Sequence, residues 1–200
     1  LLNAVGETLK PRVLAVSQLQ NTGAGNPDAG LFSASQCPKG VHAPLPGQLP
    51  ERGVVEIKGV SDDSWLTGGG AQVGKYWRQY RQVLVTNYRD FLLVGADAQG
   101  QPTVLETLRL AESADEFCSR LQQPRAFAQT HGERFIEYLQ RVLLCAASLS
   151  NPRDVAWFLA SYARDARSRL ADKPDLPALL ALRAALENAL GMHFEAADGE

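Results

Sequence analysis

Short apolar runs separated by Gly- and Pro-rich segments fill the first half of the chain, and this pattern predicts strands with few helices. Helical spacing of apolar residues occurs at the start, where Pro11 ends it, and again in the middle of this half. Alternating apolar and polar positions with β-branched side chains mark the strands. The expected order is a helix, three strands, a helix and two strands, over residues 1–10, 12–20, 29–32, 53–59, 71–80, 82–87 and 91–94.

Beyond residue 110 only helical periodicity is visible. One apolar helical face there consists of Phe135, Leu139, Val142, Leu143 and Ala146. We therefore expect an α/β core with a mixed central sheet flanked by helices at residues 1–110, followed by an α-helical extension at residues 111–200. The segment 33–52 contains four prolines and is expected to be a long connection between two strands, without an assigned role.

The composition suits one globular domain with an appendage, since 45% of the 200 residues are hydrophobic and 21% are charged. No apolar stretch has the length and flanks of a signal peptide or a membrane span. The three cysteines are odd in number and widely spaced, which argues against a disulfide framework and a zinc site. We expect a cytoplasmic location, and we expect the chain to be a piece of a longer protein.

The formal net charge of −2 gives no general attraction for nucleic acid, so any contact with DNA must be local. One candidate is the cationic group Lys75, Arg78 and Arg81, in and just after the second expected helix. A second cationic run lies near the end of the chain, and such runs are typical of a solvated helix face. It consists of Arg164, Arg167, Arg169 and Lys173.

An acidic residue and a lysine share one face of the expected strand 53–59. Because side chains alternate along a strand, Glu56 and Lys58 project to one side while their neighbours enter the core. Asp28 precedes a short apolar run that is expected to pair antiparallel with this strand and to bring a second carboxylate to the same place. Two carboxylates on neighbouring strands suit Mg²⁺, a hard cation that prefers oxygen ligands. The residues alone also allow Glu56 and Lys58 to be a surface pair on an edge strand.

Two other interpretations remain open. Residues 69–75 match the spacing of a phosphate-binding loop up to Lys75, although Tyr76 stands where such a loop needs Ser or Thr, so a P-loop nucleotide hydrolase is one alternative. A catalytically inert, nuclease-like module that docks on DNA is another. It would be expected to have lost a metal ligand, whereas Asp28, Glu56 and Lys58 are all present.

Three blocks of sequence resemble the PD-(D/E)XK nuclease superfamily, and in particular the amino-terminal nuclease domain of fused restriction-modification enzymes. The blocks are Gly25-Asn26-Pro27-Asp28-Ala29-Gly30, Val55-Glu56-Ile57-Lys58, and Gln72-Val73-Gly74-Lys75-Tyr76 followed by the strand that leads into Phe91. The resemblance covers residues 1 to about 110, and the later helices are similar to the connector that precedes an adenine-specific DNA methyltransferase in such enzymes. It implies a restriction-endonuclease-like fold and Mg²⁺-dependent hydrolysis of double-stranded DNA, with Mn²⁺ as a substitute. The implied partners are DNA and the downstream methyltransferase and specificity domains of the same polypeptide.

The resemblance also implies roles at the acidic strand. Asp28 and Glu56 would bind the metal, with the backbone carbonyl of Ile57 as a third oxygen ligand. Lys58 would orient or help deprotonate the attacking water and offset negative charge near the scissile phosphate.

Roles for the two expected helices follow in the same way. Gln72 would position the water or contact the DNA backbone, and Lys75 would meet a phosphate. Tyr76 shares a helical face with Gln72 and would lie beside it at the site; we expect equally that Tyr76 packs in the core. Glu7 would supply a further ligand through water, or else be an exposed carboxylate of the first helix.

Overall fold

The computed structural model describes residues 1–19, 21, 23–38, 41, 43–149, 151–170, 177–191 and 193. They belong to two compact units, Leu1–Val155 and Ala156–Glu200. The first unit contains the sheet and every candidate site residue near residues 28, 56 and 72.

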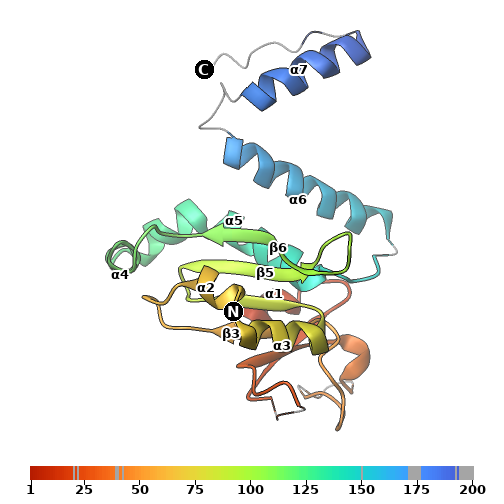
Figure 1. The fold of residues 1–200 in the computed structure, drawn as a ribbon, viewed down its shortest axis with the longest axis vertical. Coiled ribbons are helices and arrows are strands. Elements are labelled where there is room, and N and C mark those ends of the chain that lie inside the picture. The colour runs from red at the N-terminus through yellow and green to blue at the C-terminus, as the bar shows by residue number, and fades with distance from the viewer. Residues whose placement is uncertain are drawn as a thin grey trace. The chain divides into compact units, whose positions relative to one another are not determined.

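Six strands form one mixed sheet, in which their spatial order is also their order along the chain (Figure 1). The strands are β1 (Val13–Ser17), β2 (Ala29–Ser33), β3 (Val54–Ile57), β4 (Val83–Thr86), β5 (Asp90–Ala96) and β6 (Pro102–Arg109). Neighbours are antiparallel except β3 and β4, which are parallel because a helical crossover joins them. Strands β2 to β5 are buried almost throughout, which agrees with their continuous apolar runs.

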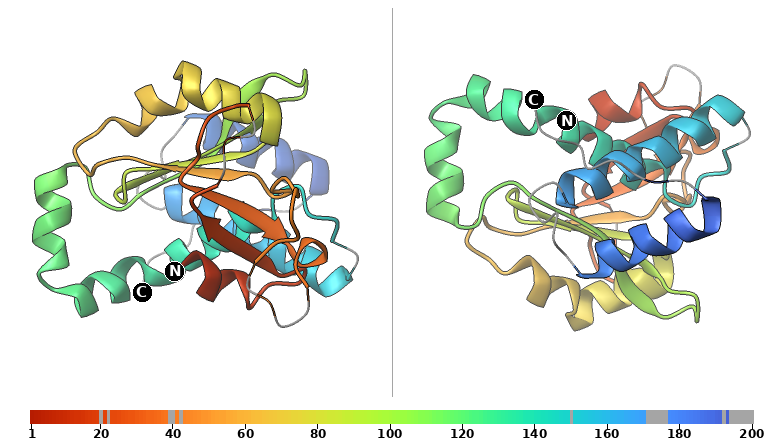
Figure 2. Two further views of the ribbon diagram at one scale, coloured as in Figure 1. Left: turned by 90° about the horizontal axis from the view of Figure 1, so that it is seen from below. Right: turned by 90° about the horizontal axis from the view of Figure 1, so that it is seen from above.

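Helices cover both faces of this sheet (Figure 2). The helices of the first unit are α1 (Leu2–Gly6), the 3-10 turn η1 (Ala34–Gln36), α2 (Ser64–Gly68), α3 (Ala71–Tyr80), α4 (Ala114–Leu121) and α5 (Pro124–Leu144). On one face, α3 buries Val73, Tyr76 and Trp77 against the valines of β3 and β4. On the other face, α1 and α5 contact each other, and Phe91 of β5 stacks on Phe135 of α5 with ring centroids 4.9 Å apart.

Strand β1 forms an edge of the sheet, and α1 covers its outer side. The Asn3 side chain binds both backbone groups of Ala15: Asn3 Nδ2 donates to the carbonyl over 3.0 Å, and Asn3 Oδ1 accepts from the N–H over 2.7 Å. Farther along the same edge, a Cβ on Gly6 would lie 2.0 Å from the Val13 carbonyl oxygen, so only glycine allows this close approach. The short helix therefore fills the place of a further strand.

The structure confirms the mixed sheet flanked by helices, the antiparallel pairing of β2 with β3, and a helix at residues 71–80. It differs in three elements. The first helix ends at Gly6 instead of near Pro11, and α2 and β6 were not expected. The five-residue α2 is too short for a periodic pattern and depends on Asp63, which caps it by accepting from two backbone N–H groups. In β6, Thr103, Glu106 and Thr107 break the apolar alternation that predicts a strand.

Helix α5 belongs to the same compact unit as the sheet, so this unit extends to Val155 and not to the boundary expected at residue 110. A buried ion pair joins α5 to β6: Arg141 Nε donates to Glu106 Oε1 over 2.6 Å, and the two side chains are 1% and 6% exposed. Next to it, Gln82 Nε2 donates to the Val142 carbonyl over 2.9 Å and joins the start of β4 to the same helix. The apolar face predicted for residues 135–146 thus covers the sheet.

The buried side chain of Gln36 holds together the two ends of the connection between β2 and β3. Its Oε1 accepts from the N–H groups of Ser33 and Glu51, and its Nε2 donates to the Leu49 carbonyl over 2.6 Å. Both ends of the connection are therefore held together at the far end of the sheet from Asp28. Residues 39, 40 and 42 of this segment lie outside the described residues.

The second unit consists of helices in its described part. Helix α6 (Pro152–Leu170) carries the ion pair Asp165–Arg169, and α7 (Pro177–Leu190) carries Arg183–Glu187. Of the cationic run expected there, Arg164, Arg167 and Arg169 are exposed on α6, and Lys173 lies outside the described residues. None of the helices described in the two units has the length and apolar character needed to span a membrane.

We predict that Arg141→Met lowers the free energy of unfolding by about 3–5 kcal/mol, because Glu106 would remain buried without its partner. Urea denaturation followed by circular dichroism measures this loss. Arg125→Met, at the exposed start of the same helix, is the matched control and should change stability by less than about 0.5 kcal/mol. Equal stability of both variants would contradict a structural role for α5 in the sheet unit.

Candidate active site

The ladder between β2 and β3 stops at the carboxyl end of β3. Residues Ala29 and Val55 are partners in this register, so continuing it by two residues would place Pro27 opposite Ile57. Proline has no N–H group and cannot donate to the Ile57 carbonyl. The sheet therefore opens at Ile57, at the end of a parallel strand pair.

Asp28 occupies this opening. Its backbone N–H donates to the Val55 carbonyl over 3.1 Å, and its side-chain Oδ2 accepts from the Ile57 N–H over 2.7 Å. A side-chain oxygen thus replaces the backbone acceptor of the interrupted ladder. Since the N–H and C=O of a strand residue point to the same edge, the Ile57 carbonyl is directed toward Asp28.

Glu56 and Lys58 form an ion pair on the α3 face of β3. Lys58 Nζ lies 2.6 Å from Glu56 Oε1, and the glutamate side chain is only 4% exposed. The hydrogen bond to Glu56 raises the pKa of Lys58, burial opposes this, and the negative charges of Glu56 and Asp28 add to the rise. The ion pair therefore favours the cationic form of Lys58 in this arrangement.

Tyr76 and Gln72 lie beside these charges on α3. Gln72 Nε2 donates to the Tyr76 hydroxyl over 2.8 Å, and Tyr76 is completely buried. Burial raises the pKa of Tyr76, and the carboxylates of Glu56 and Asp28 raise it further against the opposing effects of Gln72 and Lys58. Tyr76 therefore packs with its ring in the core, and its protonated hydroxyl lies within electrostatic reach of the cluster.

A glycine allows the loop before Asp28 to reach this hydroxyl. Gly25 has φ +113°, and a Cβ built on it would lie 3.5 Å from the Tyr76 hydroxyl oxygen. The Asn21 side chain accepts from the Gly25 N–H over 3.2 Å and holds this turn. Gly25 was part of the first sequence block, but nothing in the sequence indicated that Tyr76 would be its neighbour.

A rigid turn between β4 and β5 borders the same end of the sheet. Asn87 Oδ1 accepts from the N–H groups of Arg89 and Asp90, and Thr86 Oγ1 accepts from the N–H of Tyr88, whose φ is +69°. Asn87 Nδ2 donates to the Asp62 carbonyl over 2.8 Å and thereby ties the loop after Lys58 to this turn. The sequence does not predict this link, because an asparagine three residues before an aspartate is a turn signal but does not indicate a distant partner.

The structure brings together Asp28, Glu56, Ile57, Lys58, Tyr76 and Gln72, and it does not bring Glu7 to them. Glu7 follows Gly6, which contacts Val13 at the start of β1, whereas Asp28 lies beside the end of β1 at Ser17. Four strand residues separate the two places by about 13 Å. Glu7 is therefore an exposed carboxylate at the end of α1.

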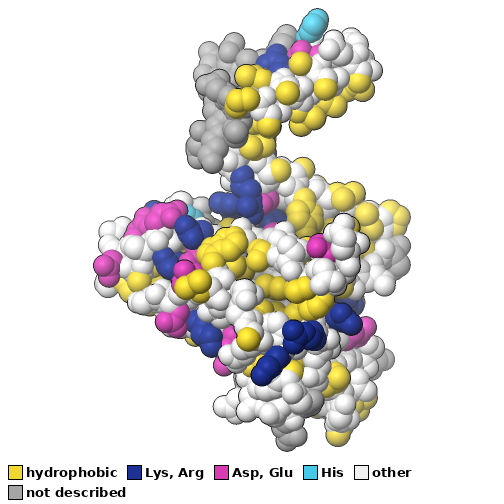
Figure 3. All heavy atoms as spheres, viewed as in Figure 1, with side chains coloured by type: hydrophobic (Ala, Val, Ile, Leu, Met, Phe, Trp, Pro, Cys, Tyr) yellow, Lys and Arg dark blue, Asp and Glu magenta, His cyan; other side chains and the backbone are white. Residues whose placement is uncertain are grey.

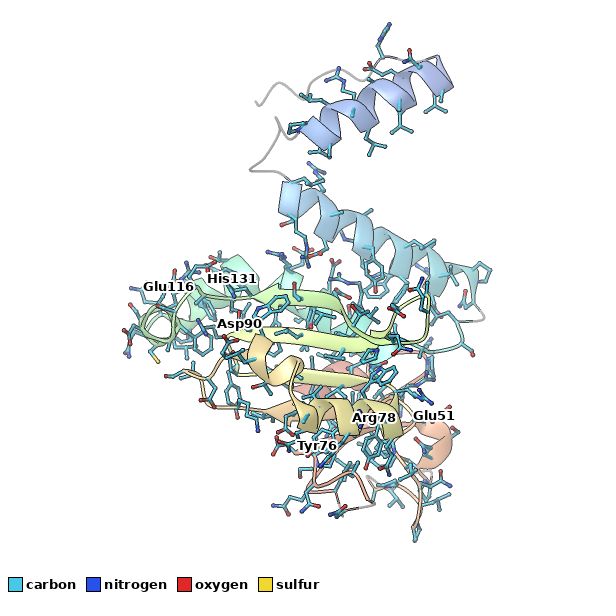
Figure 4. All side chains as sticks on the ribbon, in the orientation of Figure 1. Glu51, Tyr76, Arg78, Asp90, Glu116 and His131 are labelled. Carbon is cyan, nitrogen blue, oxygen red and sulfur yellow. The ribbon has the colours of Figure 1, made fainter. Side chains whose placement is uncertain are left out.

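Lys75 and Arg78 are exposed on the outer side of α3, and Arg81 is exposed as its C-cap; none of the three is part of the cluster. Figure 3 shows Lys and Arg side chains gathered over this helix, and Figure 4 labels Arg78 there. The proposed phosphate-binding loop is not formed. Residues 69 and 70 follow helix α2 instead of a strand, and Lys75 lies in the second turn of α3 instead of in a loop.

The oxygen donors of the opening fit a magnesium ion. Two carboxylates, on Asp28 and Glu56, lie at the same strand end as the Ile57 carbonyl, for which the ladder has no donor. Mg²⁺ keeps several of its waters and binds to proteins through one or two carboxylates, so a small ligand set suffices. Among the described residues no group of three or more His, Cys, Asp or Glu side chains that could hold a metal ion is found.

A separate apolar cavity of about 590 Å³ lies on the opposite face of the sheet, between it and α4 and α5. Leu84, Phe91, Phe127 and Leu139 are among its lining residues, all of which are described and none of which is a carboxylate. His131 is the one ionisable imidazole on its wall, and burial lowers the pKa of this ring. The cavity is apolar and lies on the face of β3 opposite to the side chains of Glu56 and Lys58, and Ile57, between them in the sequence, contributes to its wall.

Comparisons of the chain with family models, with curated proteins and with solved structures find no match.

We predict that wild type loses stability relative to Lys58→Met as the pH rises from 9 to 12. The folded-state pKa of Lys58 is above its ordinary value, so its ion pair is complete below the unfolded-state pKa of about 10.4 and is lost as the pH rises through the folded-state pKa. Urea denaturation at several pH values measures the difference. Lys10→Met, at an exposed lysine, is the control, and a pH-independent difference for Lys58→Met would refute the pairing.

Proposed function

We propose that the first unit is a Mg²⁺-dependent DNA endonuclease domain that hydrolyses phosphodiester bonds. The observation that carries the proposal is the convergence of Asp28, Glu56 and Lys58 at one interrupted strand end, with two carboxylates and one cation in contact or within electrostatic reach. The three sequence blocks that resemble PD-(D/E)XK nucleases supply these same residues. The combination of convergent geometry and ordered sequence blocks favours a nuclease over an accidental surface pair.

The chemistry of phosphodiester hydrolysis assigns the residues their tasks. Asp28, Glu56 and the Ile57 carbonyl would hold Mg²⁺, which when bound supplies Lewis acidity and lowers the pKa of a coordinated water. Lys58, a cation beside Glu56, would stabilise the negative charge that builds on the phosphoryl oxygens in the transition state. Gln72 and Tyr76 would position the water or the DNA backbone through their mutual hydrogen bond.

We further propose that this domain acts on double-stranded DNA as part of a restriction-modification enzyme, with a downstream adenine-specific methyltransferase and specificity domain in the same polypeptide. Support comes from the resemblance of residues 1 to about 110 and from the helices of the second unit, which would be a connector. Mn²⁺ would substitute for Mg²⁺, and the location would be cytoplasmic.

An inert docking module is the second candidate function. It is favoured by the ion pair itself, because Glu56 already has a partner in Lys58 and the pair would stabilise the sheet without a metal. The two candidates differ in whether a divalent cation binds and whether DNA is cut.

We predict that Asp28→Asn and Glu56→Gln each abolish cleavage of plasmid DNA in millimolar Mg²⁺ and the thermal shift that Mg²⁺ causes in wild type. Asparagine keeps an oxygen acceptor for the Ile57 N–H, so Asp28→Asn should fold normally and lose only a charged metal ligand. Lys58→Met should keep the thermal shift and lose about 100- to 1000-fold in cleavage rate.

Glu7→Gln is the matched control, because it removes an exposed carboxylate that the structure separates from the cluster. It should cleave and bind Mg²⁺ as wild type does. A wild type that neither binds Mg²⁺ nor cuts DNA, with melting behaviour equal to that of Asp28→Asn, would rule out the nuclease and favour the docking module. Cleavage retained by Glu56→Gln would rule out the assigned site.

A further inference from the structure

The exposed side of α3 carries cations without any acidic residue. Residues 71–81 contain Lys75, Arg78 and Arg81 and no Asp or Glu, although the whole chain has a net charge of −2. All three side chains are exposed, and within the part of the chain that the structure describes none of them forms an ion pair. Residues 71–81 therefore lack acidic side chains at (i, i+4) positions, which would pair with these cations.

The three cations form a strip along α3 and its C-cap. Lys75 and Arg78 are three residues apart and are neighbours on the surface of the helix. Arg81 is the C-cap residue, directly after Tyr80, and with a rise of 1.5 Å per residue its backbone lies about 9 Å beyond that of Lys75 along the axis. One strand of duplex DNA carries a phosphate every ~3.4 Å of its axis, so the strip is long enough for two or three phosphates.

One end of the strip lies at the candidate active site. Lys75 is next to Tyr76, whose hydroxyl faces the carboxylate cluster, and it is one turn from Gln72. The other end is held by an aromatic contact: the Arg81 guanidinium carbon lies 5.4 Å from the centroid of the Trp77 ring. This contact fixes the guanidinium while its edge remains available for a phosphate.

We propose that Lys75, Arg78 and Arg81 bind the phosphates of the DNA strand that flank the one at the cluster, so that α3 both positions the site and holds its substrate. The identity of the ligand rests on the proposed function, because the strip leads directly from a cluster suited to a phosphodiester. An acidic protein segment would be attracted by the same charges, but it offers nothing for the cluster to act on.

The test measures binding of a 30-base-pair duplex by fluorescence anisotropy without divalent cations, from 50 to 250 mM NaCl. Lys75→Gln, Arg78→Gln and Arg81→Gln are combined in one variant of the full chain. The expected result is a slope of log K against log salt that is shallower by 2 to 3, and an affinity at 100 mM NaCl lower by about 100-fold for two unrelated sequences.

The control variant combines Lys10→Gln, Arg12→Gln and Arg125→Gln. It removes one lysine and two arginines that are equally exposed on other elements, and it should keep the wild-type slope. Thermal melts of both triple variants check folding. Poly-glutamate serves as the probe for an acidic protein segment.

The proposal is overturned if wild type does not bind the duplex, if the α3 variant keeps the wild-type slope, if the control loses as much, or if poly-glutamate binds as tightly as DNA. Failure of the nuclease proposal would give a different result. Mg²⁺-dependent cleavage would be absent, while the salt slope of DNA binding would still depend on α3. This combination would favour a DNA-docking module.

Discussion

The hydrogen bond from the Ile57 N–H to the Asp28 carboxylate determines where the sheet ends and where its chemistry begins. The N–H group of a strand residue needs an acceptor, and a regular ladder would have supplied the carbonyl of Pro27. The carboxylate supplies it instead, while proline leaves the Ile57 carbonyl without a backbone donor. One interruption of the ladder thus produces a fixed carboxylate and a free carbonyl at once, on strands whose positions the surrounding sheet determines.

The net charge of the cluster determines how it interacts with a phosphate. Asp28 and Glu56 carry two negative charges and Lys58 carries one positive charge, so the strand end has a net charge of −1 and by itself repels a phosphate. A divalent cation would reverse this sign locally. Farther out, the exposed cations of α3 supply positive charge with no acid on the same helix. The anionic cluster and the cationic helix therefore have opposite effects on a polyanion: without a divalent cation the cluster repels it, whereas the helix attracts it.

Glu56 is buried beside a counter-charge. It projects from β3 into a face built mainly of valines and aromatic rings, where an unpaired carboxylate would be costly. Lys58, two residues later on the same strand face, provides the counter-charge at 2.6 Å. Removing Lys58 would leave a buried carboxylate without its counter-charge, whereas Lys58 is 32% exposed and can be solvated by water.

Local patterns in the sequence were sufficient for much of the fold. Alternation and apolar runs predicted β2, β3, β4 and most of β5, and helical spacing predicted α3 with its observed ends, because these elements bury one clear face or both. The pairing of β2 with β3 was expected from the apolar run that follows Asp28, and strand alternation placed Glu56 and Lys58 on one face. Three features did not follow. Glu106 faces a buried arginine from α5, so β6 has a polar residue where a pattern requires an apolar one. Glu7 lies far from the site because α1 ends early, and the bond between Asn87 and Asp62 joins residues that only the folded chain brings together.

Because α1 covers the edge of β1, this edge cannot pair with a strand of another molecule. An edge strand with free backbone groups can be extended by the strand of another molecule, but the Asn3 amide already occupies the outward N–H and C=O of Ala15, and Gly6 lies against Val13. Continuous sheet formation across this edge is blocked. Cutting both strands of a duplex requires two sites or two encounters, and a second copy that supplied the other site would have to approach through some surface other than this one.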